Sequence, residues 1–192
     1  MNSGPVAGPD GQLRCPWGVS TEDYLGYHDN EWGRPIRDDC GLFERLTLEA
    51  FQSGLSWLTI LRKREHFRAA FAGFEIEAVA RFTGKDRTRL LNDAGIVRNV
   101  AKIDAALANA RVAAGLDDGL AALVWRHQPS NRRAPATVAE VPTQTPESHA
   151  MATELKRLGF RFVGPTTAYA LMQAAGLVND HLADCSAREG SR

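Results

Sequence analysis

The segment TPESHAMATELKRLGFRFVGPTTAYALMQAAG, residues 145–176, decides the fold. Thr145 can cap a helix with its hydroxyl, and Pro146 suits the first helical position, so we predict a helix that ends near Gly159. A second helix is predicted to begin near Pro165 and to run to the end of the segment. The few residues between them predict a tight helix, hairpin, helix arrangement.

The chain before this segment also has a helical pattern, because its apolar residues recur at spacings of three and four. Asp38 or Asp39 is predicted to cap a helix that stops near Gly54, and Ser56 to cap the next helix, over 57–71. Further helical patterns lie near 75–82, 85–93, 99–114 and 118–126. The sequence therefore predicts an all-α fold.

Length and composition indicate one domain. A chain of 192 residues can bury a single substantial core. We interpret residues 1–12 as a disordered tail, since they are rich in Gly and Pro and lack the pattern of a secretory signal. Residues 13–188 then form the domain, with the helix, hairpin, helix arrangement at about 150–176. No stretch approaches the roughly 20 apolar residues of a membrane span.

Cysteine content and charge bear on compartment and partners. Three cysteines are too few and too scattered for a disulfide framework, which favours the cytoplasm. The 23 basic and 23 acidic residues cancel, which argues against nucleic-acid binding unless local patches supply the contacts. Two short basic runs are candidates, with solvated helix faces as the alternative: Arg62, Lys63 and Arg64, and Lys156, Arg157 and Arg161.

Each end of the chain offers one thiol and one imidazole. Cys15 and His28 lie near the start, and His181 and Cys185 lie near the end with three residues between them. Four such ligands suit a structural zinc ion, which prefers a closed tetrahedral site. The alternative is that the cysteines are partly buried free thiols and the histidines are ordinary polar residues.

Aromatic side chains crowd the polar region around YLGYHDNEWGRP, residues 24–35. A flat base stacks well on aromatic rings, and a cationic base is attracted to the ring faces. The alternative is that these aromatics are core anchors for an end of the chain that is poor in helix. The residues in question are Trp17, Tyr24, Tyr27 and Trp32.

Glu49 lies in the apolar pattern LTLEAFQSGLSW, where a carboxylate is costly unless it is paired or used. We consider it a candidate site residue, with a solvated carboxylate on the outer helix face as the alternative. Leu55 follows in a tight turn between two predicted helices, where it could wedge into a base stack or simply belong to the core.

Five motifs together resemble the DNA-3-methyladenine glycosylase I family, over about Cys15 to Cys185. They are YHDNEWG at 27–33, ExxQxGLSW at 49–57, DAGIVRN at 93–99, GFRFVG at 159–164 and LVNDH at 177–181. The resemblance implies the fold of the helix-hairpin-helix DNA glycosylase superfamily and base-excision repair of alkylated double-stranded DNA. Such an enzyme flips the damaged base out of the duplex and hydrolyses its N-glycosidic bond.

The resemblance also implies roles for individual residues. It assigns Cys15, His28, His181 and Cys185 to one structural zinc ion. It assigns Glu49 as the catalytic residue and Tyr27, Trp57, Trp17, Tyr24 and Trp32 to the base pocket, with Leu55 filling the gap that the flipped nucleotide leaves. It places the DNA backbone contacts at Phe162, Val163, Gly164, Thr166 and Thr167.

Two other functions remain open at this point. A zinc hydrolase would need an open metal position and a nearby general base, and four protein ligands oppose that. A damage-binding module could use the same pocket without cutting the bond. We expect a monomer. Asp180 could orient the metal site instead of acting in catalysis, and the sequence leaves its role and that of Cys40 open.

Overall fold

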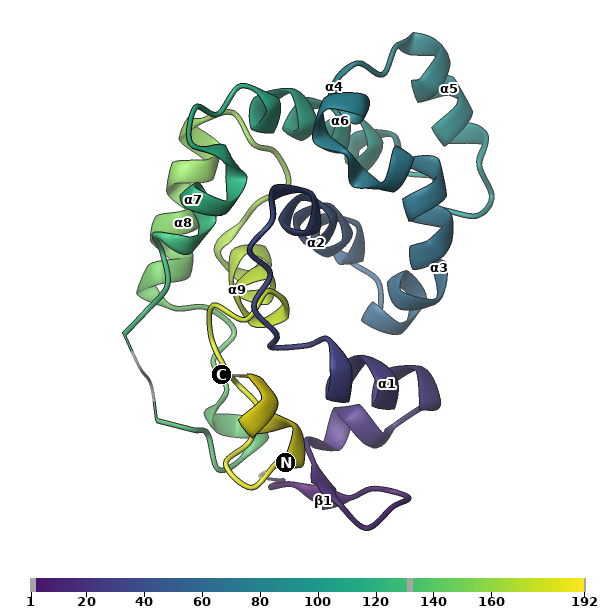
Figure 1. Ribbon diagram of the computed structural model, residues 1–192. Helices are drawn as coiled ribbons and strands as arrows, with labels where there is room; N and C mark the ends of the chain where they lie inside the picture. The colour runs from purple at the N-terminus through teal and green to yellow at the C-terminus, as the bar shows by residue number, and fades with distance from the viewer. Residues whose placement is uncertain (1–2, 131–132, 192) are drawn as a thin grey trace.

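The computed structural model describes residues 3–130 and 133–191, and most of them lie in helices (Figure 1). The α-helices are α1 (Glu22–Asn30), α2 (Asp39–Gln52), α3 (Trp57–Ala70), α4 (Ile76–Ala80), α5 (Gly84–Asn92), α6 (Val100–Ala114), α7 (Gly119–Trp125), α8 (Pro146–Arg157) and α9 (Pro165–Ala174). Short 3-10 helices are η1 (Pro16–Val19), η2 (Ala72–Phe74), η3 (Val138–Glu140) and η4 (Ser186–Ser191). Two strands, β1 (Val6–Ala7) and β2 (Leu13–Arg14), pair antiparallel.

Helix α2 is the centre of the fold (Figure 1). Nine of its 14 residues are buried, as expected for a helix that is covered on several sides. It packs against α3, α6, α7 and α9. As predicted, the Asp38 side chain caps it, accepting a hydrogen bond of 2.7 Å from the Gly41 amide. Because α2 is surrounded, Glu49 in its C-terminal half is carried into the interior.

The structure confirms the predicted helices from α2 onward and their caps. Ser56 accepts a hydrogen bond from the Thr59 amide at the start of α3. Thr145 caps α8, with Pro146 in the first turn. The two helices predicted in the opening segment, α8 and α9, pack against each other across a short connection at 158–164.

Helix α1 is an element that the sequence analysis did not predict. Of its nine residues only Tyr27 and His28 are buried, so its sequence has no apolar stripe that would mark a helix. The signal that was present is the cap: Thr21 accepts a hydrogen bond from the Tyr24 amide, and two acidic residues follow it in the first turn.

The N-terminal segment differs from the disordered tail predicted for residues 1–12. Residues 6–14 form a hairpin in which Val6 pairs with Arg14. The buried Arg14 guanidinium bonds Asp10 at 2.6 Å within the hairpin and Asp29 at 2.9 Å on α1. The ion pair with Asp29 fastens the hairpin to α1, which composition alone does not reveal. Residues 1–2 lie outside the described part of the chain.

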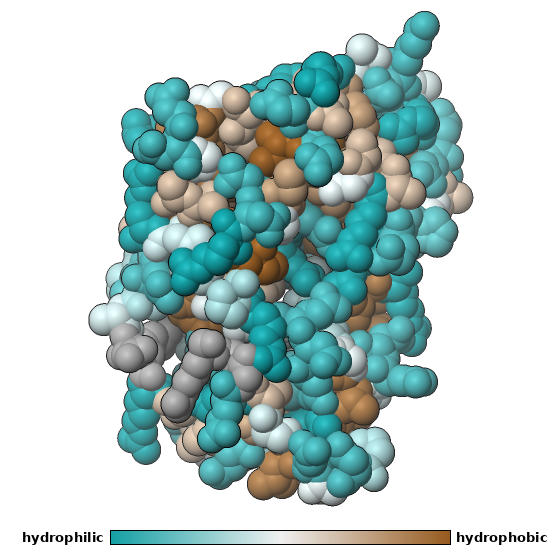
Figure 2. Space-filling model, in the orientation of Figure 1, coloured by the Kyte–Doolittle hydropathy of each residue, from teal (hydrophilic) through white to brown (hydrophobic). Residues whose placement is uncertain are grey.

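The termini meet beside a small second core. The main core lies around α2, whereas Cys15, Leu182, Cys185 and Ala187 form a separate buried cluster where the two ends of the chain come together (Figure 1). The face shown in Figure 2 is mainly hydrophilic, with hydrophobic side chains in small patches. None of the helices within 3–130 and 133–191 combines the length and apolar character needed to cross a membrane.

Candidate functional site

A cavity of about 230 Å³ opens between α1, α2, α3 and α9. All six side chains that the sequence analysis assigned to catalysis or to a base pocket line it: Trp17, Tyr24, Tyr27, Trp32, Glu49 and Trp57. Three residues that were not predicted complete the lining: Gln52, Ala170 and Gln173. The fold therefore brings together residues from both halves of the chain.

Aromatic rings form most of the cavity wall. The Tyr27 and Trp57 rings lie 5.4 Å apart at an angle of 44°, and Trp17 meets Trp32 edge-on at 5.0 Å. The Tyr24 hydroxyl accepts a hydrogen bond of 2.9 Å from the Leu58 amide, which ties α1 to the start of α3. The wall is thus largely aromatic, and it is suited to a flat ligand.

Glu49 supplies the acid in this apolar setting. It is 6% exposed, and no side chain in the described residues donates a hydrogen bond to its carboxylate. Burial raises the pKa of Glu49 to about 8, although the positive charge of Arg45 acts in the opposite direction. A buried acid without a protein partner, facing a cavity, is a recognised mark of a functional site.

A charged network supports the cavity from behind. Arg45 lies one turn before Glu49 on α2 and donates to Glu31 at 2.8 Å, with its guanidinium 5.4 Å from the centre of the Tyr27 ring. Arg64 donates to both oxygens of Glu31. Burial alone would raise the pKa of Glu31, but the two arginines lower it overall. A solvated helix face was one of the two alternatives for Arg64, and it is wrong because the side chain is 14% exposed and binds Glu31.

Two glutamines of the cavity wall were missed for different reasons. Gln52 lies three residues after Glu49, so helical spacing alone could have placed it on the same face. Gln173 lies on α9, far away in sequence, and no local pattern relates it to Glu49. Its amide nitrogen donates a hydrogen bond of 3.0 Å to Asp180.

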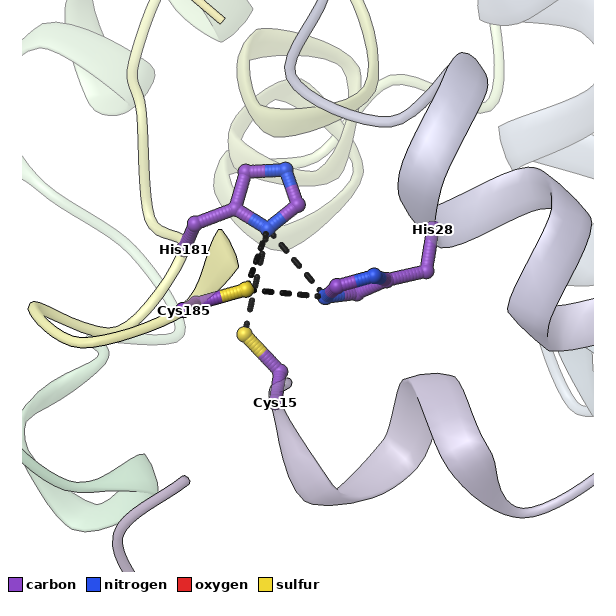
Figure 3. Close-up of side chains that lie close together, drawn as sticks. All are labelled: Cys15, His28, His181 and Cys185. Atoms are coloured by element: carbon purple, nitrogen blue, oxygen red, sulfur yellow. Dashed lines mark hydrogen bonds between the residues drawn. The ribbon is translucent and has the colours of Figure 1, made fainter. Parts of the chain in front are cut away.

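The four predicted metal ligands converge at the meeting point of the chain ends (Figure 3). Cys15, His28, His181 and Cys185 are all buried, and their ligand atoms all lie within 4.8 Å of one another. His181 Nδ1 lies 3.2 Å from His28 Nε2 and 3.5 Å from Cys185 Sγ. Cys185 Sγ lies 3.4 Å from His28 Nε2, and Cys15 Sγ lies 3.9 Å from His181 Nδ1.

These distances fit a metal ion at the centre of the cluster. Two sulfurs at about 2.3 Å and two nitrogens at about 2.0 Å from a tetrahedral ion would lie roughly 3.3–3.8 Å from one another. The four separations that join the histidines and cysteines run from 3.2 to 3.9 Å. The donor set and its size therefore suit a metal that prefers nitrogen and sulfur.

Hydrogen bonds around the cluster also orient both imidazoles correctly. His28 Nδ1 lies 2.7 Å from the Asp29 carboxylate, and His181 Nε2 lies 3.0 Å from the Trp32 carbonyl oxygen. Since each of these acceptors requires an N–H, the other nitrogen of each ring keeps its lone pair directed into the cluster. A hydrogen bond from the Cys15 thiol lowers the pKa of Cys185 and favours its thiolate.

Comparison with known proteins identifies the family to which this chain belongs. A sequence model of the methyladenine glycosylase family matches residues 17–189. The chain belongs to the methyladenine glycosylase family. DNA-3-methyladenine glycosylase 1 of Escherichia coli (strain K12) is 44% identical over 185 residues, which cover 93% of this chain and 98% of that protein. A Haemophilus influenzae DNA-3-methyladenine glycosylase is 40% identical over 178 residues, covering 90% and 96%.

Solved structures agree with this family assignment. A crystal structure of 3-methyladenine DNA glycosylase I is 43% identical, with a TM-score of 0.86, and covers 90% of this chain and 98% of that one. The Staphylococcus aureus enzyme, solved to show the structural basis of 3-methyladenine recognition, is 34% identical with a TM-score of 0.86, covering 91% and 95%. The protein is thus a DNA glycosylase.

Two exposed features of this glycosylase lie outside the cavity. Leu55 is 42% exposed, in the turn between α2 and α3. Phe162 is also 42% exposed, in the connection between α8 and α9, and it has a positive φ of 56°. Of the other residues predicted to contact the DNA backbone, Val163 is buried, Gly164 is the N-cap of α9, and Thr166 is exposed.

The two basic runs differ in their surroundings. Arg62 bonds Asp23 at 2.8 Å, and Lys63 donates to the carbonyl oxygens of Ala94 and Gly95. Because Arg64 binds Glu31, all three basic side chains of that run make contacts within the protein. The second run lies beside the α8–α9 connection and consists of exposed side chains: Lys156, Arg157 and Arg161.

Proposed function

We propose that the protein excises 3-methyladenine from alkylated double-stranded DNA by flipping the nucleotide and hydrolysing its N-glycosidic bond. The observation that carries this proposal is Glu49: a buried carboxyl group with no donor in the described residues, facing an aromatic cavity. The names of the relatives support the choice of base, since the Escherichia coli and Haemophilus influenzae proteins are 3-methyladenine glycosylases.

The chemistry of the lesion fits this site. Methylation at N3 makes the base cationic, so it leaves readily when the bond between C1′ and N9 breaks. The bonding electrons pass to the base and neutralise it, and water adds to C1′ and releases a proton. Glu49 accepts hydrogen bonds from the base and stabilises its charge, while Tyr27 and Trp57 pack against it. Extrusion from the duplex is required because the base is inaccessible while stacked.

The α8–α9 pair is proposed to act as the helix-hairpin-helix motif of the superfamily and to hold one DNA strand. Gly164 provides no side-chain cap for α9, so the first amides of that helix are available to a phosphate. Contacts are assigned to Phe162, Val163, Gly164, Thr166 and Thr167. Leu55 is proposed to fill the space that the flipped nucleotide leaves.

The Cys15, His28, His181 and Cys185 cluster is proposed to hold one zinc ion. Two thiolates and two imidazoles within 4.8 Å suit zinc, and four protein ligands leave no open position for water. The ion would join the two ends of the chain and stabilise the fold. This arrangement opposes a zinc hydrolase, which needs an open metal position.

We also propose that the enzyme works as a monomer in the cytoplasm. The cavity and the cysteine–histidine cluster are each built by one chain, so neither needs a second copy. All three cysteines are free thiols in the structure, which suits a reducing compartment.

Release of free 3-methyladenine from methylated duplex DNA, followed by chromatography, tests the function. We expect the wild type to release 3-methyladenine and to leave 7-methylguanine in the DNA. Glu49→Gln should lose most of this activity while remaining folded, whereas Glu77→Gln, an exposed matched control on α4, should keep it.

Two outcomes would overturn the proposal. Release at the wild-type rate by Glu49→Gln would remove the role of the carboxylate. No release by a folded, metal-loaded wild type that still binds methylated DNA would indicate a damage-binding module instead.

A further inference from the structure

Gln173 is one of the polar side chains of the cavity wall, together with Glu49 and Gln52. It lines the cavity from α9, and Glu49 lines it from α2. The Gln173 amide nitrogen donates a hydrogen bond of 3.0 Å to Asp180 Oδ2. The same carboxylate oxygen accepts a hydrogen bond from the Tyr169 hydroxyl, one turn earlier on α9. Tyr169 and Asp180 are both buried.

This contact decides which end of the Gln173 amide faces Asp180. A glutamine side chain has a donating nitrogen and an accepting oxygen, whereas a carboxylate only accepts. Asp180 therefore holds the nitrogen, and Oε1 is the end left for a ligand. No side chain in the described residues donates a hydrogen bond to that oxygen.

We propose that Gln173 is a specificity-determining residue that presents a hydrogen-bond acceptor to the flipped base, with Asp180 as its positioning residue. This inference rests on the proposed function, since it concerns the base bound in that cavity. Asp180 itself is absent from the cavity lining, so it orients the amide and does not touch the base.

The chemical consequence is a preference for an amine over a carbonyl on the base. Adenine carries an exocyclic N6 amine, which donates, where guanine carries the O6 carbonyl, which accepts. Glu49 and Gln173 both offer acceptors, so an adenine-type base can pair its donors with them. A guanine-type base would set its carbonyl against an acceptor, and a buried acceptor without a donor is costly.

The test measures the binding of the free bases 3-methyladenine and 3-methylguanine. The tryptophans that line the cavity provide a fluorescence signal for this titration. Gln173→Met keeps the length of the side chain and removes its carbonyl oxygen. We expect the affinity for 3-methyladenine to fall about threefold to tenfold, and that for 3-methylguanine to stay unchanged or rise, so the ratio between them decreases.

Three further variants separate specificity from stability. Gln144→Met, on an exposed loop, is the matched control and should keep the wild-type ratio. Tyr169→Phe removes the other donor to Asp180 and should lower the melting temperature without changing the ratio. Asp180→Asn allows the Gln173 amide to turn and present its nitrogen, so the ratio should fall as in Gln173→Met, with zinc content measured alongside.

The outcomes distinguish failure of the role proposed for Gln173 from failure of the proposed glycosylase function. A folded Gln173→Met variant that keeps the wild-type ratio would overturn the role of Gln173, even though excision by the wild type would stand. An unchanged ratio in metal-loaded Asp180→Asn would overturn the role of Asp180. A wild type that releases no 3-methyladenine would overturn the proposed function and this inference with it.

Discussion

The ammonium group of Lys102 lies 2.9 Å from the carbonyl oxygen of Phe51 and donates a hydrogen bond to it. A second hydrogen bond reaches the Ser53 carbonyl at 2.5 Å. The last carbonyls of a helix have no partners within the helix, and a cation there also favours the helix dipole. Lys102 therefore holds the C-terminal end of α2 at Phe51 and the start of the turn that carries Leu55.

Lys102→Met is expected to destabilise the protein by about 1–3 kcal/mol, because two carbonyl groups lose a charged donor. Excision from duplex DNA should fall more than binding of free 3-methyladenine, since the cavity remains while the Leu55 turn loosens. Urea unfolding, base release and base titration measure the three quantities. Lys85→Met, at an exposed position on α5, is the control. An equal loss in both functional assays would contradict this role.

The rate of excision is expected to depend on pH through Glu49. Because burial raises its pKa to about 8, the free enzyme holds Glu49 protonated at neutral pH. A cationic base is bound best by the carboxylate, so kcat/KM should rise with pH up to about 8 and level off above it. Single-turnover excision between pH 6 and 9.5 measures the profile, roughly tenfold per unit at most. A wild-type profile that is flat below pH 8 would contradict it.

The free energy of unfolding should also depend on pH through the ionisation of Glu49. Its pKa lies near 4.5 when unfolded and about 8 when folded, so its contribution to stability is fully present at low pH. That contribution is lost as the pH rises through about 8, because the buried group must then ionise. Glu49→Gln lacks this dependence. Between pH 5.5 and 8.5 its free energy of unfolding should therefore rise relative to that of the wild type by an amount on the order of a few kcal/mol. Parallel curves for the two proteins would argue against the raised pKa.

Removal of the metal should act through stability. Cys185→Ser, or treatment with a chelator, is expected to lower the melting temperature by several degrees or more, since the proposed ion would join both ends of the chain. Excision should decline only as the protein unfolds. Zinc content, thermal unfolding and base release are measured together, with Cys40→Ser as a control at a cysteine outside the cluster. Loss of excision by a fully folded, metal-free protein would favour a catalytic ion.

Asn109 is expected to control DNA binding through the α8–α9 connection. Its amide donates to the Arg161 carbonyl at 3.0 Å and accepts from the Arg161 amide at 2.7 Å. Asn109→Ala should cost about 1–3 kcal/mol in stability and weaken DNA binding, while free 3-methyladenine still binds. Fluorescence anisotropy with methylated duplex and base titration compare the two, and Asn92→Ala on α5 is the exposed control. Unchanged DNA affinity in Asn109→Ala would show that the Asn109 hydrogen bonds do not position the α8–α9 connection for DNA.

Local features of the sequence predicted most of the helices correctly. The caps at Asp38, Ser56 and Thr145 are where the sequence analysis placed them, because capping depends on residues only three or four positions apart. Helix α1 was missed because its buried face is aromatic and polar, and the N-terminal hairpin because its order depends on the ion pair between Arg14 and Asp29.

In the candidate site, too, some residues could be predicted from local sequence and others only from the packing of the helices. Motifs singled out Glu49 and the aromatic residues, but their convergence with Gln173 depends on how α2 packs against α9. Gln173 has no motif of its own, and its orientation comes from Asp180, which approaches only after the chain has turned beyond α9.

The sequence by itself determined most of the helices, the caps at Asp38, Ser56 and Thr145, and the residue types of the proposed metal ligands and the cavity, because these depend on the chemistry of near neighbours. Only the tertiary structure decided that Cys15 and His181, 166 residues apart, share one cluster and that Glu49 loses its water. Both are consequences of burial, since distant segments meet and pKa values shift only when the core packs.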